Sequence, residues 1–275
     1  MMSDIKISLT GKPKIKTLTT ADFIISAVVL IFLLITIYTI FFRIEYKWDD
    51  FQGDTAINIA SNFIRFDKVG MGKIIEMILS LINTLSLAFV TTITGFIVGI
   101  ILGLFAARNI SNIYISNFIR GAASFIRSIP TLIWVLIFVS GYGLTATTAV
   151  MGMFFHTLSF FIKSFAETFE EVDKGTIEAL RASGSNWLQI VFGTMLPSSL
   201  TKIVSWIAIR SEINFGVAVA IGPAAGVPGT IGSLINNASR AGDYATQGFG
   251  VILIFLTAYI MEATINKIRQ KSIIN

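Results

Sequence analysis

Long apolar runs without a single charge constrain this chain more than any other feature. One runs from Phe23 to Phe42, and a longer one lies between Glu76 and Arg108. Since about 20 apolar residues in a helix cross about 30 Å of hydrocarbon, each run can span a bilayer. A third run, Ser128 to Ile162, would overshoot the bilayer as one helix. Its Ser140-Gly-Tyr-Gly143 segment is typical of a turn, so we predict two spans there, with helices extending past the uncharged limits.

Two more spans are predicted toward the C-terminus, at about Ile203 to Ile221 and about Tyr244 to Met261. Between them, Gly222-Pro-Ala-Ala-Gly-Val-Pro-Gly229 holds too much Gly and Pro for a continuous helix. Only 13% of the 275 residues are charged, against about 25% in a soluble domain. The predicted fold class is therefore all-α, a polytopic membrane bundle of about six transmembrane helices.

Three glycines interrupt the second apolar run at four-residue spacing. Gly95, Gly99 and Gly103 share one face of the predicted helix. Small residues on one face let helices approach closely in lipid, so this spacing predicts a packing surface.

The sequence offers few groups for metal or redox chemistry. It has no Cys and one His, and its carboxylates are not clustered. Disulfides and thiolate metal sites are thereby excluded, and we expect no metal centre and no cofactor. His156 lies among Phe154, Phe155, Phe160 and Phe161, where a histidine satisfied by a neighbouring helix is favoured over a proton relay.

The basic residues predict the side of the membrane that each loop faces. Cytoplasmic loops carry an excess of Lys and Arg, and six spans place 14 of the 21 basic residues on one side. Both termini are then cytoplasmic in a multi-pass protein of the cell membrane, and the net charge of +5 requires no nucleic-acid partner. No small-residue cleavage pattern follows the first run, which indicates a retained anchor. The cytoplasmic set is Lys6, Lys12, Lys14, Lys16, Arg108, Arg120, Arg127, Lys163, Lys174, Arg181, Lys202, Lys267, Arg269 and Lys271; the opposite set is Arg43, Lys47, Arg65, Lys68, Lys73 and Arg240.

The longest predicted cytoplasmic stretch, about Lys163 to Lys202, is polar but regular. Glu178-Ala-Leu-Arg-Ala-Ser-Gly184 predicts a short helix that ends at Gly184. Ser185 or Asn186 can cap a second helix, with Gln189 completing a capping box on Asn186. Two short helices across the cytoplasmic face would form a rigid docking surface for another protein. The alternative is an ordinary amphipathic connector between spans.

This pattern resembles the EAA signature of ABC importer permeases. Glu178, Ala179 and Gly184 match its first part, and Leu196 and Pro197 match its end. The resemblance implies that these five residues form the coupling segment, which seats in a groove of a separate ATP-binding cassette ATPase subunit. It also implies a permease transmembrane domain over residues 73–275. Residues 1–72 are then an N-terminal cytoplasmic segment, the anchor helix and an external loop.

Other segments resemble the phosphonate-type branch of these permeases. They are Arg127-Ser-Ile-Pro-Thr-Leu-Ile-Trp134, Arg210-x-Glu212-x-Asn214 and Gly242-Asp-Tyr244. The resemblance implies import of a small anion, a phosphonate or a related phosphorus oxyanion, with methionine as an alternative substrate. It further implies an extracytoplasmic substrate-binding protein and a second permease copy as partners.

Charged residues inside a predicted span are costly, at about 2.5 kcal/mol or more each at its centre. Asn214 lies one turn after Arg210, whereas Glu212 is about 200° around the helix from Arg210. Our hypothesis is that Arg210 and Asn214 border the translocation path and attract an anion. Glu212 would pair with a neighbouring helix or the second copy. The alternative is a purely structural charge pair with another span.

Three function classes compete for such a chain. An ATP-driven importer permease is favoured, because no phosphate-binding loop of the form Gly-x-x-x-x-Gly-Lys-Ser/Thr occurs and ATP hydrolysis then belongs to a separate chain. An ion-coupled secondary carrier would show internal repeats and intramembrane acids, of which only Glu212 is convincing. A membrane enzyme would need a nucleophile–base pair or metal ligands, so we expect no enzyme.

Overall fold

The computed structural model describes residues 6–7, 13–14, 20–45 and 53–274, and the side chains of 20–45 and 53–267. The chain forms two compact units, residues 1–55 and 56–275. The domain boundary at residue 72 stays a prediction. Of the basic residues assigned to a membrane side, Lys12, Lys16 and Lys47 lie outside the described residues.

The first unit holds the predicted anchor. Two-residue strands, β1 (Lys6–Ile7) and β2 (Pro13–Lys14), pair antiparallel. Helix α1 (Thr20–Tyr38) continues as a π-helix over Thr39–Arg43, and none of its residues is buried. The helix Thr20–Arg43 is long and apolar enough to cross a membrane, as predicted.

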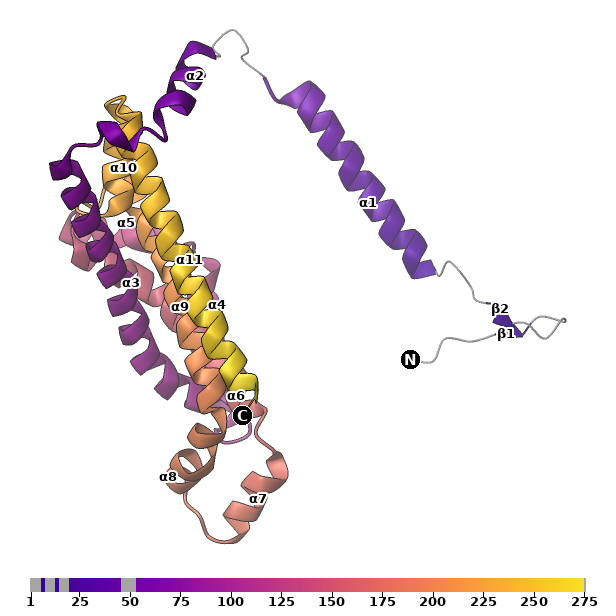
Figure 1. Ribbon diagram of the computed structural model, residues 1–275. Helices are drawn as coiled ribbons and strands as arrows, with labels where there is room; N and C mark the ends of the chain where they lie inside the picture. Colours follow the sequence, from indigo (N-terminus) through magenta and orange to yellow (C-terminus); the bar gives the residue numbers. More distant parts are fainter. Residues whose placement is uncertain (1–5, 8–12, 15–19, 46–52, 275) are drawn as a thin grey trace. The chain divides into compact units, whose positions relative to one another are not determined.

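The second unit is a helical bundle built around α3, α6 and α9 (Figure 1). Among the described residues, five helices are long and apolar enough to span a membrane, or six if the bent pair α4–α5 counts as one span. The helices are α2 (Gly53–Asn62, which begins in the first unit), a 3-10 turn (Phe66–Lys68), α3 (Met71–Ala106), α4 (Ile113–Ser128), α5 (Thr131–Tyr142), α6 (Ala146–Glu170), α7 (Lys174–Ala182), α8 (Trp187–Ile190), a π-helix (Val191–Met195), α9 (Leu196–Ala225), α10 (Ile231–Arg240) and α11 (Tyr244–Ile274).

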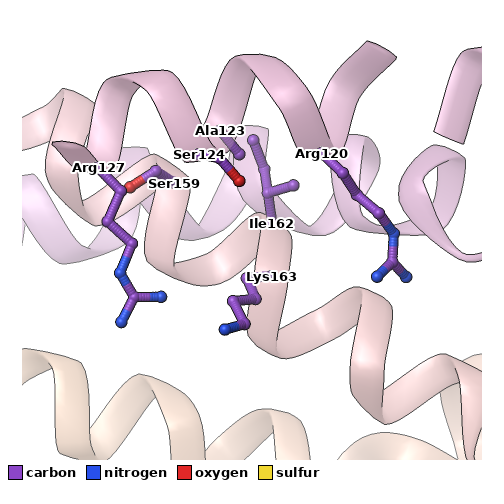
Figure 2. Close-up of a pocket in the computed structure, with 7 residues that line it drawn as sticks. All are labelled: Arg120, Ala123, Ser124, Arg127, Ser159, Ile162 and Lys163. Atoms are coloured by element: carbon purple, nitrogen blue, oxygen red, sulfur yellow. The ribbon is translucent and has the colours of Figure 1, made fainter. Parts of the chain in front are cut away.

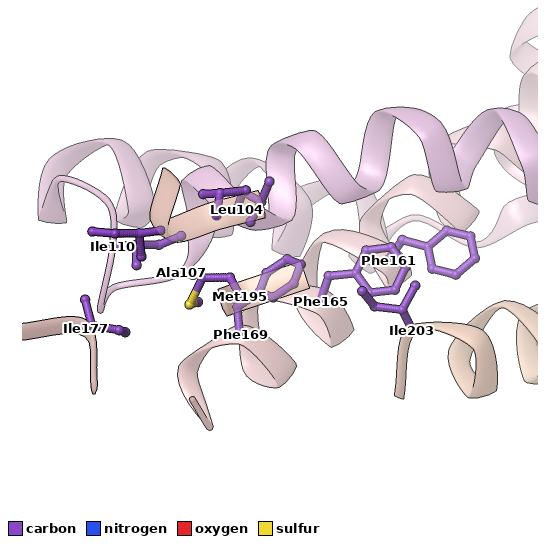
Figure 3. Close-up of a cluster of buried hydrophobic side chains, with 11 residues drawn as sticks. Leu104, Ala107, Ile110, Phe161, Phe165, Phe169, Ile177, Met195 and Ile203 are labelled. Atoms are coloured by element: carbon purple, nitrogen blue, oxygen red, sulfur yellow. The ribbon is translucent and has the colours of Figure 1, made fainter. Parts of the chain in front are cut away.

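The predicted glycine face packs against α6. A Cβ built on Gly99 would lie 2.5 Å from the Cβ of Phe161, and one on Gly95 would lie 2.6 Å from a methyl of Thr157. Such distances leave no room for a side chain, so the glycines are required for the close approach of α3 and α6. Next to this contact Phe161 and Phe165 stack, with ring centroids 5.0 Å apart (Figure 3).

The third predicted span is wrong in its geometry. The Gly143 turn is present, with φ of 74°, and α6 extends past the uncharged run as expected. Before the turn, however, the chain forms α4 and a separate 12-residue α5 at 84° to it. Pro130 explains the break, because the residue before a proline is pushed out of the helical region, and Ile129 is extended.

Two further predictions need correction near α9. The helix that Asn186 caps is no separate short helix, since Trp187–Ala225 forms one continuous 39-residue helix. The break expected from Gly222 begins only at Gly226, where φ is 71°. Pro223 is accommodated in the last turn. The carbonyl of Val219, which a non-proline residue 223 would bond, lies so close to Gly232 that a Cβ there would be 1.9 Å from it.

The bundle has two distinct ends. Helices α7 and α8 lie at one end, where the C-terminal end of α11 also lies, and α10 lies at the other (Figure 1). At the α10 end, Gly248 of α11 packs against the backbone of Phe63, which lies before α3. The segments before α3 and after α9 therefore meet there.

Candidate functional site

Helix α7 carries the predicted coupling residues and ends as the sequence predicts. Gly184 has φ of 86°, its N–H donates to the Arg181 carbonyl, and the Ser185 N–H donates to the Leu180 carbonyl, both at 3.0 Å. This pair of bonds is a Schellman motif, which favours Gly at the residue past the helix end. At the start of α7, Asp173 accepts from the Thr176 N–H at 2.8 Å.

This cap is ionised at neutral pH. Hydrogen bonds from the Thr176 backbone and hydroxyl hold the pKa of Asp173 below its ordinary value. A carboxylate with a lowered folded pKa contributes stability above its unfolded pKa and loses it as the pH falls through the folded value. The cap on α7 is therefore present throughout the physiological pH range.

One face of α7 is fixed to the end of α3. Ile177 is 2% exposed and belongs to a cluster with Ala107 and Ile110 (Figure 3). Arg181 donates to the Asn109 carbonyl at 3.3 Å. Just past α7, Trp187 donates to the Ile110 carbonyl at 3.2 Å. A helix of nine residues is marginal alone, and these contacts fix its orientation.

The other face of α7 is free. Glu178, Ala179 and Gly184 are exposed, and the Glu178 side chain has no hydrogen bond or ion pair among the described residues. Leu196 is half-buried and Pro197 is exposed, at the start of α9. The structure thus presents Glu178 and Ala179 on a helix anchored from behind, with Gly184 just past its end.

A continuous helix joins this end of the bundle to its centre. Asn186 and Gln189 form the predicted capping box, with bonds of 2.9 and 2.7 Å. The π-helix Val191–Met195 follows, and Pro197 accounts for it, because proline cannot donate to the Gly193 carbonyl and its ring crowds that group.

Arg210 and Asn214 meet inside the bundle through one threonine of α6. Arg210 is 3% exposed, and its Nη2 lies 3.0 Å from Thr157 Oγ1. Thr157 Oγ1 donates to Asn214 Oδ1 at 3.1 Å, and Asn214 donates to Thr92 of α3 at 2.9 Å. The expectation that these residues share a face is confirmed. Thr92 and Thr157 were missed by sequence reasoning, although hydroxyl residues in apolar helices are a known means of helix association.

His156 completes the surroundings of this guanidinium. Its Nδ1 lies 3.3 Å from Arg210 Nη2, so the histidine is satisfied by a neighbouring helix, as predicted. The Phe160 ring lies 5.2 Å from the guanidinium carbon. Glu212, on the other side of α9, is half-buried and has no ion pair among the described residues. Within the described part of the chain, neither Arg210 nor Glu212 forms an ion pair with another span.

A basic pocket of about 200 Å³ lies between α4 and α6 (Figure 2). Three cationic side chains line it, Arg120, Arg127 and Lys163, together with Ser124 and Ser159. Sequence reasoning used the three cations to assign membrane sides, and Arg127 also as the start of a segment that resembles phosphonate-type permeases, but it did not predict a pocket. The spacing of seven residues between Arg120 and Arg127 was the available signal for a basic surface, since it puts both on one face of α4.

An apolar helical bundle with several helices able to span a membrane is typical of a membrane-integral protein. The chain belongs to the family of binding-protein-dependent transport system inner membrane components, whose pattern matches residues 99–266. The proteins it is similar to include permease proteins of phosphate and phosphite transport systems.

Similar proteins agree with this membership. The phosphate-import permease protein PhnE of Mycolicibacterium smegmatis is 27% identical over 209 residues, covering 75% of this chain and 38% of that protein. The phosphite transport system permease protein PtxC of Stutzerimonas stutzeri is 28% identical over 181 residues, covering 66% of this chain and 64% of that protein. The chain thus spans less than two thirds of the length of either relative. The inward-facing structure of the MetNI methionine ABC transporter is 20% identical, with a TM-score of 0.66, and covers 74% of this chain and 99% of that one, which shows the shared fold.

Proposed function

We propose that this permease forms the translocation path for a small phosphorus oxyanion, a phosphonate or a related ion such as phosphite or phosphate. The names of the two relatives support this substrate class. The buried Arg210 supports it too, because a cation inside the bundle favours an anionic solute. Arg210 and Asn214 would border the path, and Glu212 would pair with the second copy.

The exposed face of α7 is the observation that carries the second part of the proposal, that transport is driven by a separate ATPase. A separate ATP-binding cassette ATPase docks against Glu178, Ala179 and Gly184, with Leu196 and Pro197 closing the docking segment. Because Ile177 and Trp187 fix this segment to α3 and α9, a movement of the ATPase is transmitted to the core helices. ATP-driven closure then rocks two bundles between inward-facing and outward-facing states.

Further partners follow from the two ends of the bundle. One docking segment per chain and two ATPases per complex require two permease copies, which we propose to be identical. The α7 end and both termini face the cytoplasm, and the α10 end receives an extracytoplasmic substrate-binding protein. The protein resides in the cell membrane.

Ala179→Trp tests the docking proposal. A bulky side chain on the exposed face of α7 would obstruct the docking groove while leaving the buried Ile177 face intact. Loss of about 1.4 kcal/mol of contact energy lowers affinity tenfold, so we expect at least about a tenfold loss of ATPase co-purification. Ala241→Trp, exposed at the opposite end, is the control. Undiminished co-purification of the Ala179→Trp variant would refute docking at α7.

A further inference from the structure

The basic pocket between α4 and α6 is not used by the coupling segment. Its volume of about 200 Å³ admits several water molecules and hence a small tetrahedral ion. Three cations and two serines line it, and no carboxylate does. In Figure 2 the charged ends of Arg120, Arg127 and Lys163 extend toward the same side of α4.

Arg120 has partners within the chain. Its Nη2 lies 2.6 Å from Glu170 Oε1, and its Nε donates to the Ala106 carbonyl at 2.8 Å. The Arg108 N–H donates to the same Glu170 oxygen at 2.8 Å. Arg120 is therefore held in place and largely neutralised, so it closes one side of the pocket.

Arg127 and Lys163 have no comparable partners. Arg127 is exposed, and its side chain has no hydrogen bond or ion pair among the described residues. Lys163 reaches only Glu167, at 3.9 Å, and both side chains are more than half exposed, at 58% and 54%. An exposed pair at that distance contributes little, so the pocket keeps positive charge available for a ligand.

The serines lie on the same helix faces as these two cations. Ser124 precedes Arg127 by three residues and Ser159 precedes Lys163 by four, spacings that put side chains side by side on a helix. The α4 wall of the pocket presents Arg120, Arg127 and the Ser124 hydroxyl. The α6 wall presents Lys163 and Ser159, whose hydroxyl donates to the His156 carbonyl at 3.0 Å. Tetrahedral oxyanions are bound by this combination, since they accept several hydrogen bonds at once.

The pocket lies along the C-terminal half of α6, a helix that is long and apolar enough to span a membrane. Lys163 is seven residues from the end of α6 at Glu170, or about 10 Å along the helix, and Ser159 is about 16 Å from it. Unpaired cations at such depth face an aqueous recess, because burial in hydrocarbon is too costly. The recess lies toward the α7 end, since α7 follows α6 directly.

We propose that this pocket binds a phosphorus oxyanion on the α7 side of the permease, with Arg127 and Lys163 as its ligands and Ser124 beside them. The inference rests on the phosphorus oxyanion substrate proposed above. The same chemistry is offered by free phosphite, phosphate or alkylphosphonate and by the phosphate of an anionic lipid headgroup, and the experiment separates these sources.

The absence of Cys in this chain permits a direct test. Ser124→Cys places a single thiol in the pocket of the permease–ATPase complex, reconstituted in nanodiscs of phosphatidylcholine. Labelling of this chain by an anionic and a cationic methanethiosulfonate is followed with and without phosphite, phosphate or methylphosphonate. Tyr114→Cys, 80% exposed in the first turn of α4, is the matched control outside the pocket.

We expect the anionic reagent to label Ser124→Cys about tenfold faster than the cationic one, as a potential of a few kT produces. Added oxyanions should slow that labelling, and Arg127→Gln or Lys163→Gln should abolish both effects while Tyr114→Cys shows neither. Slowing by phosphatidylglycerol in the nanodisc and by no free oxyanion would assign the site to a lipid headgroup. Equal rates for both reagents, without slowing by any oxyanion or lipid, would overturn the proposal. Because this readout needs no ATP hydrolysis, a permease whose ATPase ignores phosphorus oxyanions would fail the proposed function and leave the pocket result standing.

Discussion

At the scale of single residues, the buried polar chain through Thr157 shows how a charge is tolerated in this bundle. One hydroxyl accepts from Arg210 and donates to Asn214, so three side chains from α6 and α9 share one bond network. The guanidinium also lies within reach of His156 Nδ1 at 3.3 Å. The sequence predicts that Arg210 and Asn214 share a face. It does not predict the threonine, because a hydroxyl among apolar residues carries no periodic signal.

Replacing Thr157 tests that network. Thr157→Val keeps the shape of the side chain but leaves the Arg210 and Asn214 groups without their shared partner, a loss of about 1–3 kcal/mol. Thr157→Ser retains the hydroxyl and removes the methyl that contacts Gly95. In thermal unfolding of the purified permease, we expect Thr157→Val to lower the Tm clearly more than Thr157→Ser. Equal Tm values for the two variants would show that the hydroxyl does not stabilise this site.

At the scale of helices, the contact between α3 and α6 could be predicted from the sequence, whereas the bend and the length of other helices could not. The four-residue glycine spacing predicts the α3–α6 contact, because it depends on a local period that the sequence displays. The bend between α4 and α5 was missed, although Pro130 was visible, because charge counting alone does not register a break within an apolar run. The length of the helix Trp187–Ala225 was missed because its prolines suggest breaks that do not occur. A π-helix accommodates Pro197, and the close contact of the Val219 carbonyl with Gly232 accommodates Pro223.

Gly99→Ala probes the α3–α6 contact. The new methyl would lie 2.5 Å from Phe161 Cβ, so the two helices must separate or Phe161 must move. Overpacking of this kind lowers the free energy of unfolding by about 1–3 kcal/mol, so we expect a lower Tm of the purified permease and weaker assembly with its partner subunits. Gly72→Ala, in the first turn of the same helix, meets nothing within 4 Å and serves as the control. A Tm for Gly99→Ala at or above that of Gly72→Ala would exclude tight glycine packing.

At the scale of the whole molecule, the two ends of the bundle have different tasks in this account. The α7 end holds an exposed helix fixed from behind, and the α10 end holds the connections around α3, α10 and α11. Helix α9 joins the α7 end to the buried Arg210. The sequence predicts the class of the protein and, through the motif from Glu178 to Pro197, the helix that we propose to dock the ATPase. Substrate choice depends on side chains from several helices, such as those around Arg210, and no local motif specifies that arrangement.

ATP hydrolysis by the reconstituted complex of this chain, its ATPase and its binding protein tests the central claim most directly. Alkylphosphonates, phosphite, phosphate and methionine would be added in turn to nanodiscs that hold this complex. The account predicts that hydrolysis rises with one or more of the phosphorus oxyanions and does not respond to methionine. Stimulation by methionine alone would contradict the proposed substrate, and failure of the ATPase to assemble with this chain would contradict coupling through α7.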